Sequence, residues 1–203
     1  MNGFSDSLRQ KFQTWRLAQP INHAKRHNLL LFLIYGMPRY NNNLVGQTDP
    51  AHRQPDLDGI SGLGDAPWLL GGVKSLSYVV NAAAQREAAR RGADDVLFTT
   101  TDGYCLDGPT SGVIVVDRDR LRTTPTGATG LLGSVTVATV VDAARADGWT
   151  ASYELIPVGD LPAADGVWLV NSGRGAAPIH TLDGRPQPVA ERLTRAIARY
   201  AGF

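Results

Sequence analysis

The pattern of hydrophobic and polar residues changes near residue 66 of the chain. Before this point the apolar residues have no regular spacing, apart from a helical pattern at 5–18 and a short apolar run at 29–35. The stretch 38–65 is rich in Pro, Gly, Asn and Asp, which is typical of loops. From residue 66 onward, apolar positions recur with helical or strand periods. We therefore divide the chain into an N-terminal segment, 1–65, and a domain, 66–203.

Three helices are predicted in this domain, at 76–88, 135–146 and 188–200. The first follows from apolar residues that recur at helical spacing, and Gly92 closes it. Ser134 stands before the second helix, where its hydroxyl is suited to cap the free N–H groups. The third helix is amphipathic, with apolar residues along one side.

Strands are predicted between these helices from short runs rich in β-branched and aromatic residues. In chain order the predicted strands are 94–100, 104–106, 112–116, 150–158, 166–172 and 177–182. A tight Thr-Asp-Gly turn joins the first two. The strands follow one another in hairpin-like succession and lack a strict alternation with helices, so the sequence predicts a mixed α+β fold.

Composition limits the classes of protein to which the chain can belong. With 203 residues, 43% of them hydrophobic and 19% charged, it is long and apolar enough for a large globular domain. Its net charge of +1 gives no general attraction to nucleic acid or to an anionic membrane. The apolar run 29–35 is too short to span a bilayer. A soluble protein is expected, without nucleic-acid or membrane partners.

The cysteine and histidine residues indicate neither disulfides nor a metal site. Cys105 is the single cysteine, which fits a reducing, cytoplasmic location, and its place in a predicted strand favours a buried, inert thiol. His23 and His27 have a spacing that suits a metal on a helix, but no Cys, Glu or further His stands nearby. A solvated basic surface is the better interpretation, and no metal is predicted.

Lys74 is the first candidate for chemistry. The chain has three lysines against seventeen arginines, and Lys74 lies within an apolar stretch. An arginine stays protonated, whereas a lysine amine can lose its proton when desolvated and attack a carbonyl to form a Schiff base. The local alternative is a lysine whose stem covers apolar surface while its amine stays in water. The local sequence leaves both interpretations open.

Three further stretches are candidates for a ligand site. Asp107 stands at a strand end, although Asp-Gly is also a common turn dipeptide. The loop 129–136 leads into a helix N-terminus, which favours phosphate but is equally an ordinary cap. The stretch 171–177 is a second anion-binding turn or a plain glycine-rich loop. Together with Lys74, these stretches match the requirements of pyridoxal 5'-phosphate: an amine for its aldehyde, a carboxylate for its ring nitrogen and N–H groups for its phosphate.

The motifs "GGVKSLSY", "DGYCLDGPTSGVIVV", "GLLGSVT" and "ADGVWLVNSGRGAAPIHTLDGRP" also occur in the order and spacing of a known family. From Ala66 to Phe203 the chain resembles the class-IV (fold type IV) pyridoxal-phosphate enzymes. These include branched-chain and D-amino-acid aminotransferases and aminodeoxychorismate lyase. The resemblance implies a fold type IV large domain preceded by a shortened or divergent N-terminal segment, a remnant of the family's small domain.

The resemblance also implies roles for individual residues. Lys74 corresponds to the catalytic Schiff-base lysine, which holds the cofactor and moves a proton at the substrate Cα. Asp107 corresponds to the carboxylate that pairs with the pyridine nitrogen and makes the ring an electron sink. The other residues implied to bind the cofactor are Tyr78, at its ring hydroxyl, and Val135, Thr136, Ser172 and Gly173, at its phosphate.

The chain departs from the family pattern at several positions. Asp107 stands where glutamate is usual and is one methylene shorter. Gly112 replaces a common asparagine, and Val137 replaces a common arginine. Residues 1–65 show none of the usual small N-terminal domain, which supplies an arginine to the cofactor phosphate, and no residue here is assigned that role.

The resemblance leaves three functions open. The first is an aminotransferase that moves an amino group between a small amino acid, branched-chain or D, and a 2-oxo acid. The second is 4-amino-4-deoxychorismate lyase, which uses the same lysine to release pyruvate and 4-aminobenzoate. The third is a non-catalytic relative. A nucleic-acid-binding module has support only from the basic run at 23–27. The resemblance also implies a homodimer.

Overall fold

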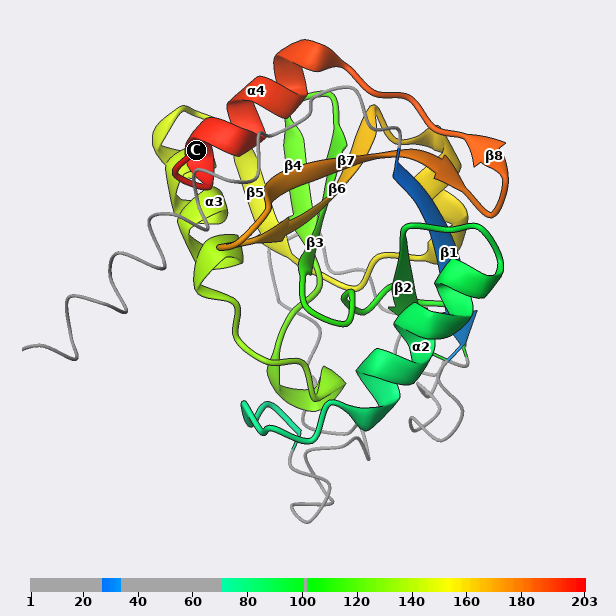
Figure 1. The fold of residues 1–203 in the computed structure, drawn as a ribbon. Coiled ribbons are helices and arrows are strands. Elements are labelled where there is room, and N and C mark those ends of the chain that lie inside the picture. Colours follow the sequence, from blue (N-terminus) through cyan, green and yellow to red (C-terminus); the bar gives the residue numbers. More distant parts are fainter. Residues whose placement is uncertain (1–26, 34–70, 101) are drawn as a thin grey trace, which may run out of the picture.

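The computed structural model describes residues 27–33, 71–100 and 102–203, which form one mixed sheet with helices packed around it (Figure 1). The strands are β1 (His27–Leu33), β2 (Asp95–Thr99), β3 (Gly112–Asp117), β4 (Arg120–Thr123), β5 (Thr150–Tyr153), β6 (Gly166–Asn171), β7 (Gly175–Leu182) and β8 (Arg185–Pro186). The helices are α2 (Val79–Arg90), α3 (Val135–Ala146) and α4 (Glu191–Tyr200), with the 3-10 helices η5 (Gly127–Thr129) and η6 (Val158–Ala163). The predicted helix at 5–18 lies outside the described residues.

The strand order in the sheet is β2-β1-β7-β6-β3-β4-β5, and β8 pairs with β7. Strand β1 is parallel to both of its neighbours, and β4 is parallel to β5, whereas β7, β6, β3 and β4 pair in antiparallel fashion. The mixed α+β fold predicted from the sequence is confirmed. Strand β1 comes from the segment 1–65 and shares the sheet of the domain, while the boundary at residue 66 stays a prediction.

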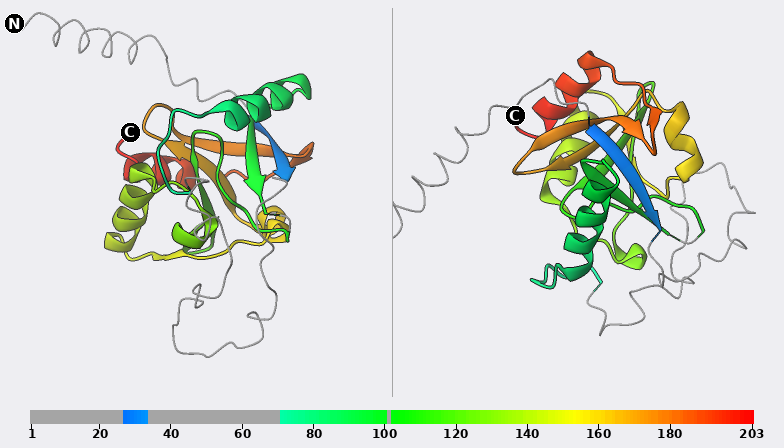
Figure 2. Two further views of the ribbon diagram at one scale, coloured as in Figure 1. Left: turned by 90° about the horizontal axis from the view of Figure 1, so that it is seen from below. Right: turned by 45° about the vertical axis from the view of Figure 1, so that its right-hand side comes forward.

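Both faces of the central strands are buried. Ile114 of β3 pairs with Trp168 of β6, and both contribute to the core beneath α3 and α4. Val113 and Leu169 pair one position earlier on the opposite face, in a second core cluster. Helices α3 and α4 lie side by side on one flank, and α2 covers β1 and β2 (Figure 2). Because successive side chains point to opposite faces, burial on both sides requires the continuous apolar runs seen in the sequence.

The predicted helices are confirmed, with differences at their first residues. Ser134 caps α3 as expected, because its Oγ accepts a hydrogen bond from Val137 N at 3.2 Å. Gly92 follows α2 with a left-handed φ of 76°. Helix α4 begins at Glu191 and not at 188. The segment just before it is hydrogen-bonded to β7, where Gln187 N donates to the His180 carbonyl at 2.8 Å.

The strand predictions are less accurate than the helix predictions. The run 104–106 forms only isolated bridges, from Cys105 to Thr99 and from Tyr104 to Pro157. Strand β5 is shorter than predicted and ends at Tyr153. The sequence analysis does not predict β1, which covers most of the apolar run 29–35, nor β4 and β8, which are short and largely polar.

Cys105 is buried, as the sequence predicts, and desolvation raises the pKa of its thiol to about 12, which disfavours the reactive thiolate. Within the described ranges, no helix is long and apolar enough to cross a membrane. His23 lies outside these ranges, and the absence of a metal site stays a prediction.

Candidate active site

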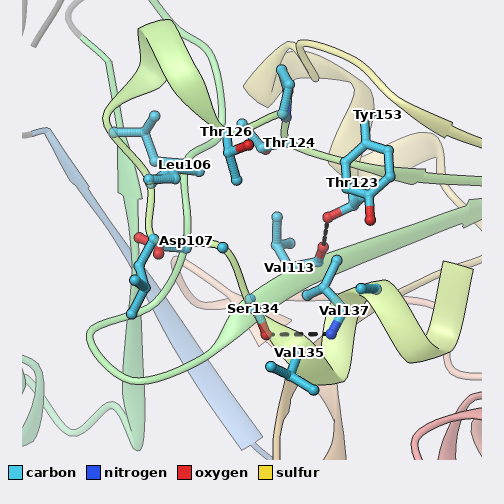
Figure 3. A pocket seen from close by; sticks show the side chains of 16 residues that line it. Leu106, Asp107, Val113, Thr123, Thr124, Thr126, Ser134, Val135, Val137 and Tyr153 are labelled. Carbon is cyan, nitrogen blue, oxygen red and sulfur yellow. Dashed lines mark hydrogen bonds between the residues drawn. The ribbon is translucent and has the colours of Figure 1, made fainter. Parts of the chain in front are cut away.

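A cavity of about 510 Å³ lies between the start of α3, the loop that follows β4, and the strand end that carries Asp107 (Figure 3). Asp107 and Tyr153 stand on opposite sides of it, with Ser134, Val135 and Val137 along one margin. Its lining residues are Leu106, Asp107, Gly112, Val113, Thr123, Thr124, Pro125, Thr126, Leu131, Leu132, Gly133, Ser134, Val135, Val137, Ala138 and Tyr153. Segments far apart in the sequence therefore meet at one concave site.

Asp107 is anchored to the sheet through its backbone. Its carbonyl accepts a hydrogen bond from Phe98 N at 2.9 Å, and Leu106 N donates to the Phe98 carbonyl at 2.8 Å. Desolvation raises the pKa of its carboxyl from 3.8 to about 7, although its own backbone N–H acts in the opposite direction. A carboxyl with this pKa exchanges a proton near neutral pH. A positively charged partner in the cavity would favour its ionised form.

The N-terminus of α3 offers free hydrogen-bond donors at the cavity. Ser134 Oγ satisfies Val137 N, whereas the N–H groups of Val135 and Thr136 have no acceptor among the described residues. Val135 lines the cavity, whereas the next residue, Thr136, is buried and is not among the lining residues. Free N–H groups and the helix dipole at this end favour an anion.

Lys74 lies in the extended segment just before α2 and is exposed. Its Nζ donates a hydrogen bond to Tyr78 Oη at 3.4 Å, so the structure brings these two predicted residues together. Neither residue lines the cavity. Their segment is nevertheless joined to its margin, because Gly72 N donates to the Gly130 carbonyl at 2.8 Å, next to the lining residue Leu131.

Ser172 and Gly173 form an exposed turn between β6 and β7 and do not line the cavity. Gly173 N donates to Asn171 Oδ1 at 2.9 Å, so this N–H is already engaged within the turn. Of the two predicted phosphate-binding segments, at α3 and at this turn, the second is therefore not part of the cavity lining. Only the first opens directly on the cavity.

Two residues near the site were not recognised in the sequence. Asn81 of α2 donates from Nδ2 to the Pro109 carbonyl at 2.6 Å, which ties the helix after Lys74 to the turn after Asp107. Tyr153 faces the cavity, and burial raises the pKa of its hydroxyl. No local signal identifies either residue, because each depends on a tertiary contact between distant segments.

Comparison with known proteins defines the class to which this fold and site belong. The architecture is that of the fold IV transaminases: a fold IV-transaminase from Curtobacterium pusillum superposes with a TM-score of 0.68 at 38% sequence identity. That superposition covers 94% of this chain and 53% of the transaminase. Residues 42–182 match the family amino-transferase class IV, and the chain belongs to this family.

Two relatives from Mycobacterium tuberculosis extend the comparison. The chain is 45% identical over 132 residues to a bifunctional aminodeoxychorismate lyase / D-amino acid transaminase, covering 62% of this chain and 46% of the relative. The PLP-bound form of a hypothetical aminotransferase superposes with a TM-score of 0.70 at 33% identity, covering 95% of this chain and 56% of that chain. The chain thus spans about half the length of the relatives it matches.

Proposed function

We propose that this chain is the cofactor-binding part of a pyridoxal-phosphate-dependent aminotransferase. Its reaction would move an amino group between a small amino acid, branched-chain or D, and a 2-oxo acid. The observation that carries the proposal is one cavity lined by both the Asp107 carboxyl and the free N-terminus of α3. The D-amino acid transaminase activity in the name of the 45% identical relative supports it.

The residues at the cavity fit pyridoxal 5'-phosphate. Asp107 supplies a partly buried carboxyl for the ring nitrogen, and the free N–H groups of Val135 and Thr136 supply donors for the phosphate. When bound, the cofactor supplies an aldehyde and an electron-withdrawing ring. Lys74 offers the amine for this aldehyde and moves the proton at the substrate Cα, while Tyr78, already within hydrogen-bond reach of Lys74, orients the amine. Of the two turn residues implied by the resemblance, Gly173 has its N–H engaged by Asn171 Oδ1, so Ser172 is the one left to add a phosphate contact.

A labelling experiment tests the role of Lys74. The protein is incubated with pyridoxal phosphate, reduced with borohydride, digested and mapped by mass spectrometry. We expect the label on the peptide that carries Lys74 and its loss in Lys74→Arg, which keeps the charge but has no nucleophilic amine. A label found only on Lys11 or Lys25 would contradict the assignment.

The lyase is the second candidate function, and the bifunctional name of the same relative is the observation that favours it. Transamination leaves the cofactor in its amine form until a 2-oxo acid arrives, whereas elimination needs no second substrate. D- or L-alanine alone should therefore bleach the visible band of the loaded protein and release pyruvate once per site. Many turnovers of aminodeoxychorismate without bleaching would identify a lyase. Bound cofactor without either reaction would identify a non-catalytic relative.

The proposed assembly is a homodimer. Large apolar side chains are exposed in the Lys74 segment and α2 (Val73, Leu76, Val79 and Val80) and at the start of α3 (Leu132 and Val135). Leu76 is 99% exposed. Exposed apolar side chains that gather on a surface are typical of a protein–protein contact. Sedimentation equilibrium should give a dimer that Leu76→Glu weakens, and a monomeric wild type would contradict the proposal. The cytoplasmic location stays a prediction.

A further inference from the structure

Ser111 lies at a junction of hydrogen bonds outside the cavity. Its hydroxyl is buried and accepts two hydrogen bonds, from Asn171 Nδ2 at 2.9 Å and from Arg174 Nη2 at 3.0 Å. Arg174 Nη2 also donates to Asp95 Oδ2 at 2.7 Å, and the Asp95 side chain is buried at the start of β2. The turn between β6 and β7 is thus fastened to two other segments.

Ser111 also belongs to the turn that follows Asp107. Gly108 N donates to the Ser111 carbonyl at 2.8 Å, which closes this turn directly behind the carboxyl. The next residue, Gly112, lines the cavity and pairs with Val170 of β6. A displacement of Ser111 would therefore move both the turn after Asp107 and the turn after β6.

Asn171 fixes the shape of that turn. Its Oδ1 accepts hydrogen bonds from Gly173 N at 2.9 Å and from Arg174 N at 2.7 Å, while its Nδ2 donates to Ser111. The side chain thus engages both of these backbone donors within the turn and holds its conformation. The N–H and the hydroxyl of Ser172 have no partner among the described residues. Ser172 is therefore the residue of this turn that is free to bind a phosphate.

We propose that Ser111 and Asn171 are positioning residues of the cofactor site. They hold the turn so that Ser172, and not Gly173, contacts the phosphate, and they couple this contact to the turn behind Asp107. The inference rests on the proposed function, because it concerns the same ligand. It goes beyond that function because it assigns the phosphate contact of this turn to Ser172 and the positioning of Ser172 to Ser111 and Asn171.

The test compares two ligands that differ only in the phosphate. Dissociation constants for pyridoxal phosphate and for pyridoxal are measured by fluorescence titration with wild type, Ser111→Ala and Ser172→Ala. We expect both variants to bind pyridoxal phosphate between about two- and tenfold more weakly, the range for one lost hydrogen bond. Pyridoxal affinity should be unchanged in Ser172→Ala and should fall less than pyridoxal phosphate affinity in Ser111→Ala, because Ser111 also belongs to the turn after Asp107. General damage to the fold would instead weaken both ligands equally. Thr110→Ala, at an exposed neighbouring hydroxyl without a described partner, is the matched control and should bind as wild type does.

Asn171→Ala provides an independent variant in case Ser111→Ala fails to fold, and it should show the same selective loss. An unchanged ratio of the two dissociation constants in Asn171→Ala or in a folded Ser111→Ala would overturn the inference while leaving the proposed function intact. Full retention of phosphate affinity by Ser172→Ala would overturn the assignment of the contact to Ser172. Failure of the wild type to bind either ligand would instead overturn the proposed function, and this inference with it.

Discussion

Gly112 has no room for a side chain, because Val137 of α3 fills the place where its Cβ would lie. The overlap would be with Cγ2 of a buried β-branched residue, which has little rotamer freedom to move aside. These are the two positions at which the sequence departs from a common asparagine and a common arginine. Their contact shows that the two departures belong together: a small residue on β3 accommodates an apolar one on α3.

A double-mutant cycle tests this coupling. Gly112→Ala should destabilise the protein by about 1–3 kcal/mol through overpacking. Val137→Ala should cost about 2 kcal/mol through the cavity it leaves. In the double variant the new methyl group enters the space vacated by valine, so the combined loss should be smaller than the sum by about 1 kcal/mol. Urea unfolding measures all three, and strictly additive losses would contradict the contact.

Asp107 should make the stability of the cofactor-free protein depend on pH. Its pKa is 3.8 without the influence of the fold and about 7 in the folded protein. Between these values the folded state binds more protons than the unfolded state, so the free energy of unfolding falls as the pH rises from about 4 to about 7. Asp107→Asn has no charge to desolvate and should not show this fall.

The measurement is the urea midpoint of wild type and Asp107→Asn at several pH values across this window. The advantage of the variant should grow with pH and level off above about 7. Other ionisable groups are common to both proteins and cancel in the difference. Parallel curves for the two proteins would show that the carboxyl titrates normally.

The free donors at α3 are tested by Val135→Pro. Proline removes the N–H of the first helical residue but is tolerated there, so the fold should persist while pyridoxal phosphate binds more weakly. Ser134→Ala is the comparison for stability, because it removes the cap and should cost about 1 kcal/mol while the N–H groups of Val135 and Thr136 remain. Equal cofactor affinity in wild type and Val135→Pro would argue against a phosphate at this helix.

Asn81 should hold the Lys74 segment in register with the Asp107 turn. Asn81→Ala removes the donor to the Pro109 carbonyl and should lower stability by about 1 kcal/mol. Hydrogen exchange should become faster at the N-terminal turn of α2 and around Pro109, while α4 stays unchanged. Gln85→Ala, on the same helix, is the matched control, because the Gln85 side chain has no hydrogen bond to any of the described residues and its loss should not change exchange around Pro109. Equal protection in Asn81→Ala and wild type would show that the bond does not link the segments.

The sequence predicts those parts of the fold that depend on local signals. Helix α3 is an example, because Ser134 marks its start and the apolar period continues through it. Strand β4 is not predicted, because its two arginines flank Leu121 and give no apolar pattern, although Leu121 and Thr123 are buried. Arg122 is also buried, with an ion pair to Asp160 at 2.9 Å that only tertiary structure provides.

In the candidate site, too, local motifs are predictable from the sequence and tertiary contacts are not. Motif order singled out Lys74 and Asp107 individually, and the structure gives each a physical context. The links between them were not predictable, because Asn81 reaches a residue 28 positions away and Asn171 reaches one 60 positions away. Hydrogen bonds across such separations leave no periodic trace in the sequence.

Strand β1 has a consequence for the design of shortened proteins. In the sheet it stands between β2 and β7, which do not pair with each other. A fragment that begins after Leu33 would therefore leave two rows of unpaired backbone groups in place of one continuous sheet. Exposed edges of this kind recruit strands from other molecules, so such a fragment should aggregate even though it retains Lys74, Asp107 and the whole of α3.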